Sequence, residues 1–176
     1  MSVVLPVLSA LLFSPRRVYL ASSWRNDAQP AAVQALRDAG HEVYDFRNPP
    51  ASTGFSWKQA TNEPPPWSAE RTREVLELPI SQAGFDSDFT AMQWADTFVM
   101  LQPCGRSAAL ELGWACGAGK LTLVVLADGQ EPELMLKCAD RLTTSVAEAV
   151  DLLRRWDPVA RVFVDGLAKP RGRAIS

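Results

Sequence analysis

Runs of apolar residues recur along the chain at intervals that suit buried strands separated by helices. The run LTLVVL at 121–126 is wholly apolar and predicts a strand covered on both faces. Segment 41–46, HEVYDF, instead alternates, a period that is also typical of a strand. The predicted strands are 17–21, 41–46, 97–101, 121–126 and 141–144.

Helical spacing fills the intervals between these strands. In the first interval Ala32, Leu36 and Ala39 fall on one face, and polar residues fall on the other. Asn26 or Asp27 is expected to cap this helix. Further helices are predicted from Ser68 to Pro79, from Ser81 to Ala95, over 107–117, and from a capping box at Ser145 to about Trp156.

The order of these elements predicts the fold class. One strand, one helix and one strand within about thirty residues form a βαβ unit, so parallel strands are expected. Continued alternation predicts an α/β fold: a single-domain, doubly wound parallel sheet in flavodoxin-like order, with helices on both faces. In such sheets ligands bind at the carboxyl ends of the strands.

The predicted domain spans residues 17–157 and carries an appended segment at each end. Residues 1–16 form an apolar extension that Pro6 interrupts, with no basic residue before the apolar run and no cleavage signal after it. Neither a membrane span nor a signal peptide is therefore expected. Residues 158–176 are expected to form a C-terminal tail.

A proline-rich insertion interrupts the domain at 48–67. Its prolines and glycine exclude regular structure over much of its length, and long loops of this kind often serve as lids. The aromatic residues Phe55, Trp57 and Trp67 favour a lid that packs against the domain.

Composition narrows the class of function. The 176 residues suffice for a continuous core without disulfides or metals. With a net charge of −2 and scattered basic residues, no nucleic-acid partner is expected. Cys104, Cys116, Cys138 and His41 form no close ligand pair, so no metal site is expected either. An odd number of cysteines favours reduced thiols and a cytoplasmic location.

A single carboxylate stands in the helix predicted at 107–117. Glu111 is the only charged residue between Arg106 and Lys120, and it is expected near the end of the first helical turn. Small residues such as Gly113 would let a neighbouring backbone or a ligand approach this helix. A buried structural carboxylate normally pairs with a basic residue. We interpret Glu111 as functional, with an ion-paired structural role as the alternative.

Two loops at the same edge carry groups that suit an anion. Ser22, Ser23 and Arg25 follow the first strand, and Arg106 and Ser107 open the helix that carries Glu111. Hydroxyl, guanidinium and backbone N–H groups at a helix start bind anions. Each loop also suits an ordinary helix cap.

Four further residues are candidates for the site. Asp88 lies on a predicted helix and is expected one helix away from the binding edge, with a cap as its alternative role. Tyr19 lies within the first strand, and its hydroxyl can reach the strand end. Trp24 and Trp57 lie in loops at the same edge and suit stacking on a planar ring.

Three segments of the chain resemble the nucleoside 2-deoxyribosyltransferase-like family. They are VYLASS in the first strand, DFTAMQWAD before the third strand, and RSAALELGWACGAGK after it. The resemblance extends roughly from Arg17 to Trp156. The family includes transferases that exchange bases on deoxyribose and hydrolases that cleave deoxynucleoside 5′-monophosphates.

The resemblance implies a role for individual residues. Glu111 matches the nucleophile that attacks the anomeric carbon, Asp88 the acid that assists the departing base, and Tyr19 the residue that orients the nucleophile. Ser23 and Arg25 are similar to the pair that holds the 5′-phosphate in the hydrolases. The family implies no cofactor, and it implies a homodimer or larger homo-oligomer. The expected function is cleavage or transfer of the N-glycosidic bond of a (deoxy)nucleoside or its 5′-monophosphate.

The chain also departs from the family pattern. Gly105 stands where the transferases carry an aspartate and the hydrolases a serine, and Ser107 is the nearest hydroxyl. The insertion at 48–67 has no family counterpart that we can match. Two alternatives therefore stay open: a nucleotide-binding or sensing module without catalysis, and an NAD-type glycohydrolase.

Overall fold

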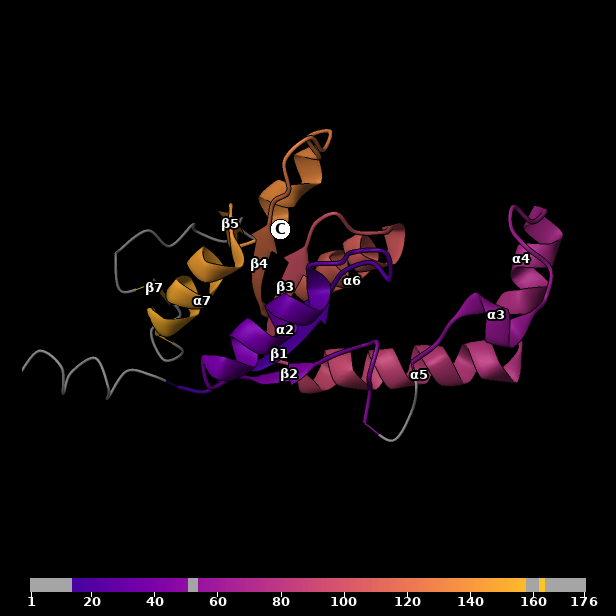
Figure 1. Cartoon of the computed structure of the whole chain (residues 1–176), viewed down its shortest axis with the longest axis horizontal. Coiled ribbons are helices and arrows are strands. Elements are labelled where there is room, and N and C mark those ends of the chain that lie inside the picture. Colours follow the sequence, from indigo (N-terminus) through magenta and orange to yellow (C-terminus); the bar gives the residue numbers. More distant parts are fainter. Residues whose placement is uncertain (1–13, 51–53, 158–161, 164–176) are drawn as a thin grey trace, which may run out of the picture.

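The computed structural model describes residues 14–50, 54–157 and 162–163. Its centre is a five-stranded sheet in the order β2-β1-β3-β4-β5, with all neighbouring strands parallel (Figure 1). The strands are β1 (Arg17–Ala21), β2 (Glu42–Tyr44), β3 (Thr97–Leu101), β4 (Leu121–Val125) and β5 (Arg141–Thr143). The predicted α/β class, parallel pairing and flavodoxin-like order are confirmed.

Helices cover both faces of the sheet, as predicted. The helices α2 (Gln29–Asp38) and α7 (Val146–Arg154) lie on one face, and α5 (Pro79–Trp94) and α6 (Arg106–Gly117) lie on the other. Successive side chains of a strand point to opposite faces. Thus Val18 packs under α2 and α7, whereas Tyr19 packs under α5 and α6.

Several element boundaries differ from the prediction, among them those of β2, of α2, and of α5, which begins at Pro79 rather than at Ser81. Strand β2 ends at Tyr44 because Asp45 turns the chain: its carboxylate accepts hydrogen bonds from the side chains of Gln29 (2.7 Å) and Asn48 (2.8 Å). Helix α2 begins after Ala28 without a side-chain cap. Asn26 does not cap it, because its side chain is used to join two loops.

The predicted capping box opens α7 with a shift of one residue. Ser145 Oγ accepts a hydrogen bond from the Glu148 N–H at 3.1 Å, as expected. The Glu148 carboxylate accepts from the N–H of Thr144 at 2.7 Å rather than from that of Ser145. Both interactions still satisfy N–H groups at the start of the helix.

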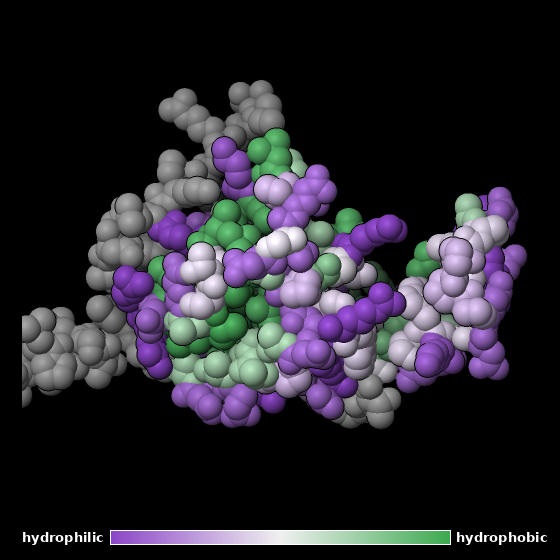
Figure 2. All heavy atoms as spheres, turned by 45° about the horizontal axis from the view of Figure 1, so that its top comes forward, coloured by the Kyte–Doolittle hydropathy of each residue, from purple (hydrophilic) through white to green (hydrophobic). Residues whose placement is uncertain are grey.

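An arm projects from the body of the molecule. It consists of α3 (Trp57–Ala60), α4 (Ala69–Leu76) and the first half of α5, and its tip stands apart from the main body (Figures 1 and 2). The one helical turn of α3 forms where the insertion lacks proline and glycine, and the Ser56 N–H donates to Gln59 Oε1 at 2.8 Å.

The aromatic residues of the insertion pack mainly on one another and on α5. The Trp57 ring lies 4.9 Å from Phe55 and 5.5 Å from Trp67, measured between centroids. A Cβ added at Gly84 of α5 would lie 2.8 Å from the Phe55 ring. The insertion therefore contacts α5 through Phe55, while Trp57 keeps 43% of its surface exposed.

The remaining described elements lie near β5 and the C-terminal end. They are the 3-10 helix η1 (Leu134–Cys138) and the antiparallel pair β6 (Trp156–Asp157) and β7 (Val162–Phe163). The predicted extension before residue 14 and most of the predicted tail after residue 157 lie outside the described residues. In the part of the chain that the structure describes, no helix combines the length and apolar character needed to cross a membrane.

Candidate active site

A buried asparagine joins the two loops at the carboxyl ends of β1 and β3. Asn26 is 3% exposed, and its amide nitrogen donates to Ser22 Oγ (3.0 Å) and to the Pro103 carbonyl (3.1 Å). Its Oδ1 accepts from the Ala28 N–H at 3.0 Å. The loop after β1 is thereby attached to the loop that precedes α6. From the sequence, Asn26 was expected only as a helix cap.

Glu111 is held by α6 against the end of β1. Because α6 begins at Arg106, Glu111 lies in its second turn rather than near the end of its first. The side chain is half-buried and interacts with the hydroxyl of Tyr19, which is 1% exposed and donates a hydrogen bond to it. No lysine or arginine among the described residues forms an ion pair with Glu111.

The surroundings of Glu111 disfavour its charged form. Burial, and secondarily the charge of Asp88, raise the pKa of Glu111 from 4.5 to about 7, against the hydrogen bond from Tyr19, which lowers it. Burial chiefly, and the charge of Glu111, raise the pKa of Tyr19 too, so Tyr19 stays a neutral donor. A carboxylate kept from water and from cations is suited to meet a positive charge that develops on a ligand.

Asp88 lies closer to this edge than the sequence suggested. It sits in the middle of α5, and the hydroxyl of Tyr44 donates to its Oδ1 at 2.8 Å. Burial raises the pKa of Asp88, and the Tyr44 hydrogen bond partly offsets that rise. Since the charge of Asp88 acts on Glu111, the two carboxylates belong to one site. Asp88 does not act as a helix cap.

A cavity of about 390 Å³ opens beside Asp88. Its walls come from α5 and from the insertion, so the insertion borders this cavity. The lining residues are Pro49, Gly54, Phe55, Gln59, Ile80, Ala83, Gly84, Ser87 and Asp88. Phe55, which the sequence analysis did not place in the site, contributes the aromatic wall. Trp57 does not line this cavity.

The predicted anion loop after β1 is only partly available. Ser22 Oγ donates to the Leu101 carbonyl at 2.9 Å and is thereby occupied. Ser23 Oγ accepts from the Arg25 N–H at 3.1 Å and keeps its own proton. The Arg25 side chain is exposed, and no hydrogen bond or ion pair engages it within the described ranges.

Arg47 fixes the shape of the same loop. Its Nη2 donates to the carbonyls of Ser23 (2.9 Å), Trp24 (2.8 Å) and Asn26 (2.9 Å). The guanidinium also lies 5.8 Å from the ring of Trp24, which packs edge-on against Phe46 and stays 49% exposed. Arg47 follows β2 in the sequence, and nothing in its local pattern indicated this role.

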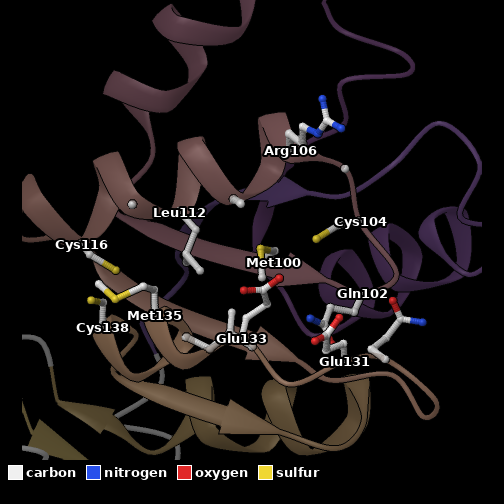
Figure 3. Close-up of a pocket in the computed structure, with 15 residues that line it drawn as sticks. Met100, Gln102, Cys104, Arg106, Leu112, Cys116, Glu131, Glu133, Met135 and Cys138 are labelled. Carbon is white, nitrogen blue, oxygen red and sulfur yellow. The ribbon is translucent and has the colours of Figure 1, made fainter.

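A second cavity, of about 450 Å³, lies on the other side of α6 (Figure 3). Gly105, Arg106 and Gly113 line it, together with the three cysteines, but Glu111 does not. A Cβ added at Gly113 would touch nothing within 4 Å, so no described backbone uses its small size. Among the described residues, no group of three or more histidine, cysteine or acidic side chains is placed to hold a metal ion.

The structure thus separates the predicted catalytic residues from the predicted residues at the start of α6. Tyr19, Asp88 and Glu111 come together on the face covered by α5 and α6. Ser107 is exposed one turn before Glu111, whereas Gly105 and Arg106 border the second cavity. Tyr44, Asn26, Phe55 and Arg47 are the residues that the sequence analysis missed.

Comparison with known proteins supports the fold. No protein-family model and no curated protein matches the chain. Among solved structures it is similar to a 2-deoxyribosyltransferase from the psychrotolerant bacterium Bacillus psychrosaccharolyticus, with 21% identity and a TM-score of 0.52, over 83% of this chain and 96% of that one. It is also similar to a CMP N-glycosidase from Clostridium botulinum, with 15% identity and a TM-score of 0.41, over 76% and 93% of the two chains. The chain therefore has the flavodoxin-like α/β fold of a 2-deoxyribosyltransferase.

Proposed function

We propose that this protein cleaves or transfers the N-glycosidic bond of a (deoxy)nucleoside or its 5′-monophosphate, with Glu111 as the nucleophile. The observation that carries the proposal is a half-buried carboxylate with a raised pKa and without an ion-pair partner among the described residues, coupled to a second carboxylate that lines a cavity. The sequence resemblance to the nucleoside 2-deoxyribosyltransferase-like family and the shared fold point the same way.

The proposed chemistry follows from the charges. As the bond between the anomeric carbon and the base nitrogen breaks, positive charge develops on the sugar. Burial destabilises the Glu111 carboxylate, and the positive charge on the sugar offsets that destabilisation. The carboxylate therefore interacts more strongly with the transition state than with the bound substrate. A Glu111 oxygen then bonds to the anomeric carbon, while the electron pair of the broken bond leaves with the base.

Asp88 serves as the acid for the departing base. It lines the cavity of about 390 Å³, which is large enough for a nucleobase. Asp88 donates or shares a proton as negative charge develops on the base nitrogen. Water or a second base then attacks the anomeric carbon, gives up a proton to the Asp88 carboxylate and displaces the Glu111 oxygen, which completes hydrolysis or transfer respectively.

A 5′-phosphate would bind at the loop after β1. The Arg25 guanidinium and the Ser23 hydroxyl are the groups of this loop that the described structure leaves available. Arg25→Ala should therefore raise KM for a 5′-monophosphate about tenfold and leave KM for the unphosphorylated nucleoside unchanged. Equal effects on the two substrates would remove Arg25 from the phosphate site.

The decisive experiment measures base release. The wild-type protein is incubated with deoxynucleosides, their 5′-monophosphates and NAD, and free base is quantified by chromatography. Glu111→Ala should abolish release, while Glu131→Gln, an exposed glutamate at the second cavity, should leave it intact. Addition of a second base separates transfer from hydrolysis. Release that survives Glu111→Ala would refute the proposed nucleophile.

Lack of turnover would favour the binding-module alternative. In that case a nucleotide raises the melting temperature without being consumed. Release of nicotinamide from NAD alone would favour the glycohydrolase. No stabilisation and no base release with any compound in the panel would overturn the proposal as a whole.

We also propose that the protein forms a homodimer or larger homo-oligomer, as the family resemblance implies. Phe85 on α5 and Leu110 on α6 are 58% and 75% exposed and fit an interface. Light scattering coupled to size-exclusion chromatography measures the mass in solution. A mass of one chain, 19.3 kDa, at micromolar concentration would contradict this expectation.

A further inference from the structure

The chain contains two tyrosines, and each contacts one carboxylate of the site. Tyr19 and Tyr44 are register partners in the parallel pair of β1 and β2, so their side chains leave the sheet on the same face. Their rings stack with centroids 5.3 Å apart, and Tyr19 stacks in turn on Phe98 of β3 at 4.9 Å. This row of rings holds both hydroxyl groups in place.

The hydrogen bonds of Tyr44 have a definite direction. Its hydroxyl lies 2.8 Å from Asp88 Oδ1 and 3.2 Å from Ser87 Oγ. The Tyr44 hydroxyl donates to Asp88 Oδ1, and since a phenol has one proton it accepts from Ser87. Over residues 14–50 and 54–157, no other side chain donates to Asp88.

We propose that Tyr44 is a positioning residue of this site, which holds one oxygen of Asp88 and leaves the other for the departing base. Tyr19 does the same for Glu111, so two register-matched tyrosines orient carboxylates that come from two different helices. The catalytic part of this inference rests on the proposed function. The hydrogen bond from Tyr44 to Asp88 does not rest on the proposed function, and its effect can be measured without any substrate.

The hydrogen bond from Tyr44 acts on the pKa values of both carboxyl groups. The Tyr44 hydrogen bond lowers the pKa of Asp88 against the effect of burial, and the resulting charge on Asp88 raises the pKa of Glu111. The other ionisable groups that interact with this pair are Tyr19 on β1, Tyr44 on β2 and Cys104 in the loop before α6. Loss of the Tyr44 hydroxyl should therefore move the two carboxyl groups in opposite directions.

The test is a carbon-13 NMR titration of side-chain carboxyl groups in wild-type protein and Tyr44→Phe. Phenylalanine keeps the ring stack and removes only the hydroxyl. Asp88→Asn and Glu111→Gln assign the two resonances. In Tyr44→Phe the titration of Asp88 should move to higher pH and that of Glu111 to lower pH. In the matched variant Tyr19→Phe, only the Glu111 titration should move substantially, and it should move to higher pH.

An Asp88 titration that is the same in wild-type protein and Tyr44→Phe would overturn the inference. If Tyr44→Phe does not fold, Ser87→Ala replaces it, because Ser87 donates to the Tyr44 oxygen and strengthens its bond to Asp88. Ser87→Ala should move both titrations in the same directions by a smaller amount. No movement in Ser87→Ala would then count against the inference.

Kinetics test the catalytic part. With a substrate from the base-release panel, Tyr44→Phe should lower kcat about tenfold with little change in KM, and should shift the dependence of kcat on pH. A normal kcat together with displaced titrations would show that Tyr44 holds Asp88 without serving the reaction, which overturns the positioning role. If no protein releases base, the proposed function fails, and the titration still decides whether Tyr44 holds Asp88.

Discussion

Glu111→Gln should make the protein more stable at alkaline pH while it removes the nucleophile. The folded protein raises the pKa of Glu111 from 4.5 to about 7, mainly through burial. Below pH 4.5 the side chain is neutral in both the folded and the unfolded chain, so folding carries no penalty. As the pH rises, the unfolded chain ionises first, and the folded state loses stability until the pH exceeds about 7.

The size of the effect follows from the shift. One pKa unit corresponds to about 1.4 kcal/mol, so a rise from 4.5 to about 7 costs the folded wild-type protein about 3 kcal/mol at pH 8. Glutamine has nearly the same shape, still accepts the hydrogen bond from Tyr19, and carries no charge. Relative to wild type, Glu111→Gln should therefore gain about 2–3 kcal/mol between pH 5 and pH 8.

Urea unfolding at both pH values, followed by tryptophan fluorescence, measures this gain. The matched control is Glu77→Gln at the end of α4, whose side chain is exposed and whose stability difference from wild type should be the same at both pH values. If Glu111→Gln also showed the same difference at pH 5 and pH 8, Glu111 would ionise normally in the folded protein. The case for an activated carboxylate would then be lost.

Three further substitutions test the supports of the site. Tyr19→Phe removes the hydrogen bond that lowers the pKa of Glu111, so the pH at which base release becomes half-maximal should rise; an unchanged profile would contradict this. Asn26→Ala removes the donor to Ser22 Oγ and to the Pro103 carbonyl and the acceptor of the Ala28 N–H. It should lower the free energy of unfolding by about 2–3 kcal/mol in urea, with a loss below about 1 kcal/mol as the opposing result. Gly54→Ala should lower the free energy of unfolding by about 1–3 kcal/mol and lower Tm, because Gly54 has φ +72° and a Cβ would lie 2.6 Å from the Phe46 carbonyl oxygen. A wild-type Tm would show that the loop can rearrange freely.

Glu111 could be recognised in the sequence because its signal is local. A lone charge among small and apolar residues within one helix implies burial, and the structure half-buries Glu111 and raises its pKa. Asp88 was placed on the correct helix but one helix too far from the site, because the sequence does not specify how far α5 is rotated about its axis. Tyr44 and Asn26 were missed because their partners lie 44 and up to 77 positions away in the chain.

Periodicity, together with the rules for connecting parallel strands, was sufficient for the order of the five-stranded sheet. Apolar runs and helical spacing gave β1 and β3 with correct bounds, and right-handed crossovers between parallel strands left few possible strand orders. Both depend on residues that are near one another in the sequence, so the order of the strands can be predicted from local sequence patterns.

The active-site constellation required the packed molecule. The register of β1 on β2 brings the two tyrosines level, and the rotation of α6 turns Glu111 toward Asp88 while Gly113 faces the second cavity. Such contacts depend on how each helix packs against the sheet, and in a close-packed interior the position of one helix depends on the side chains of all its neighbours. Local sequence does not carry that information, because the same pattern of residues is compatible with several rotations of a helix over a sheet.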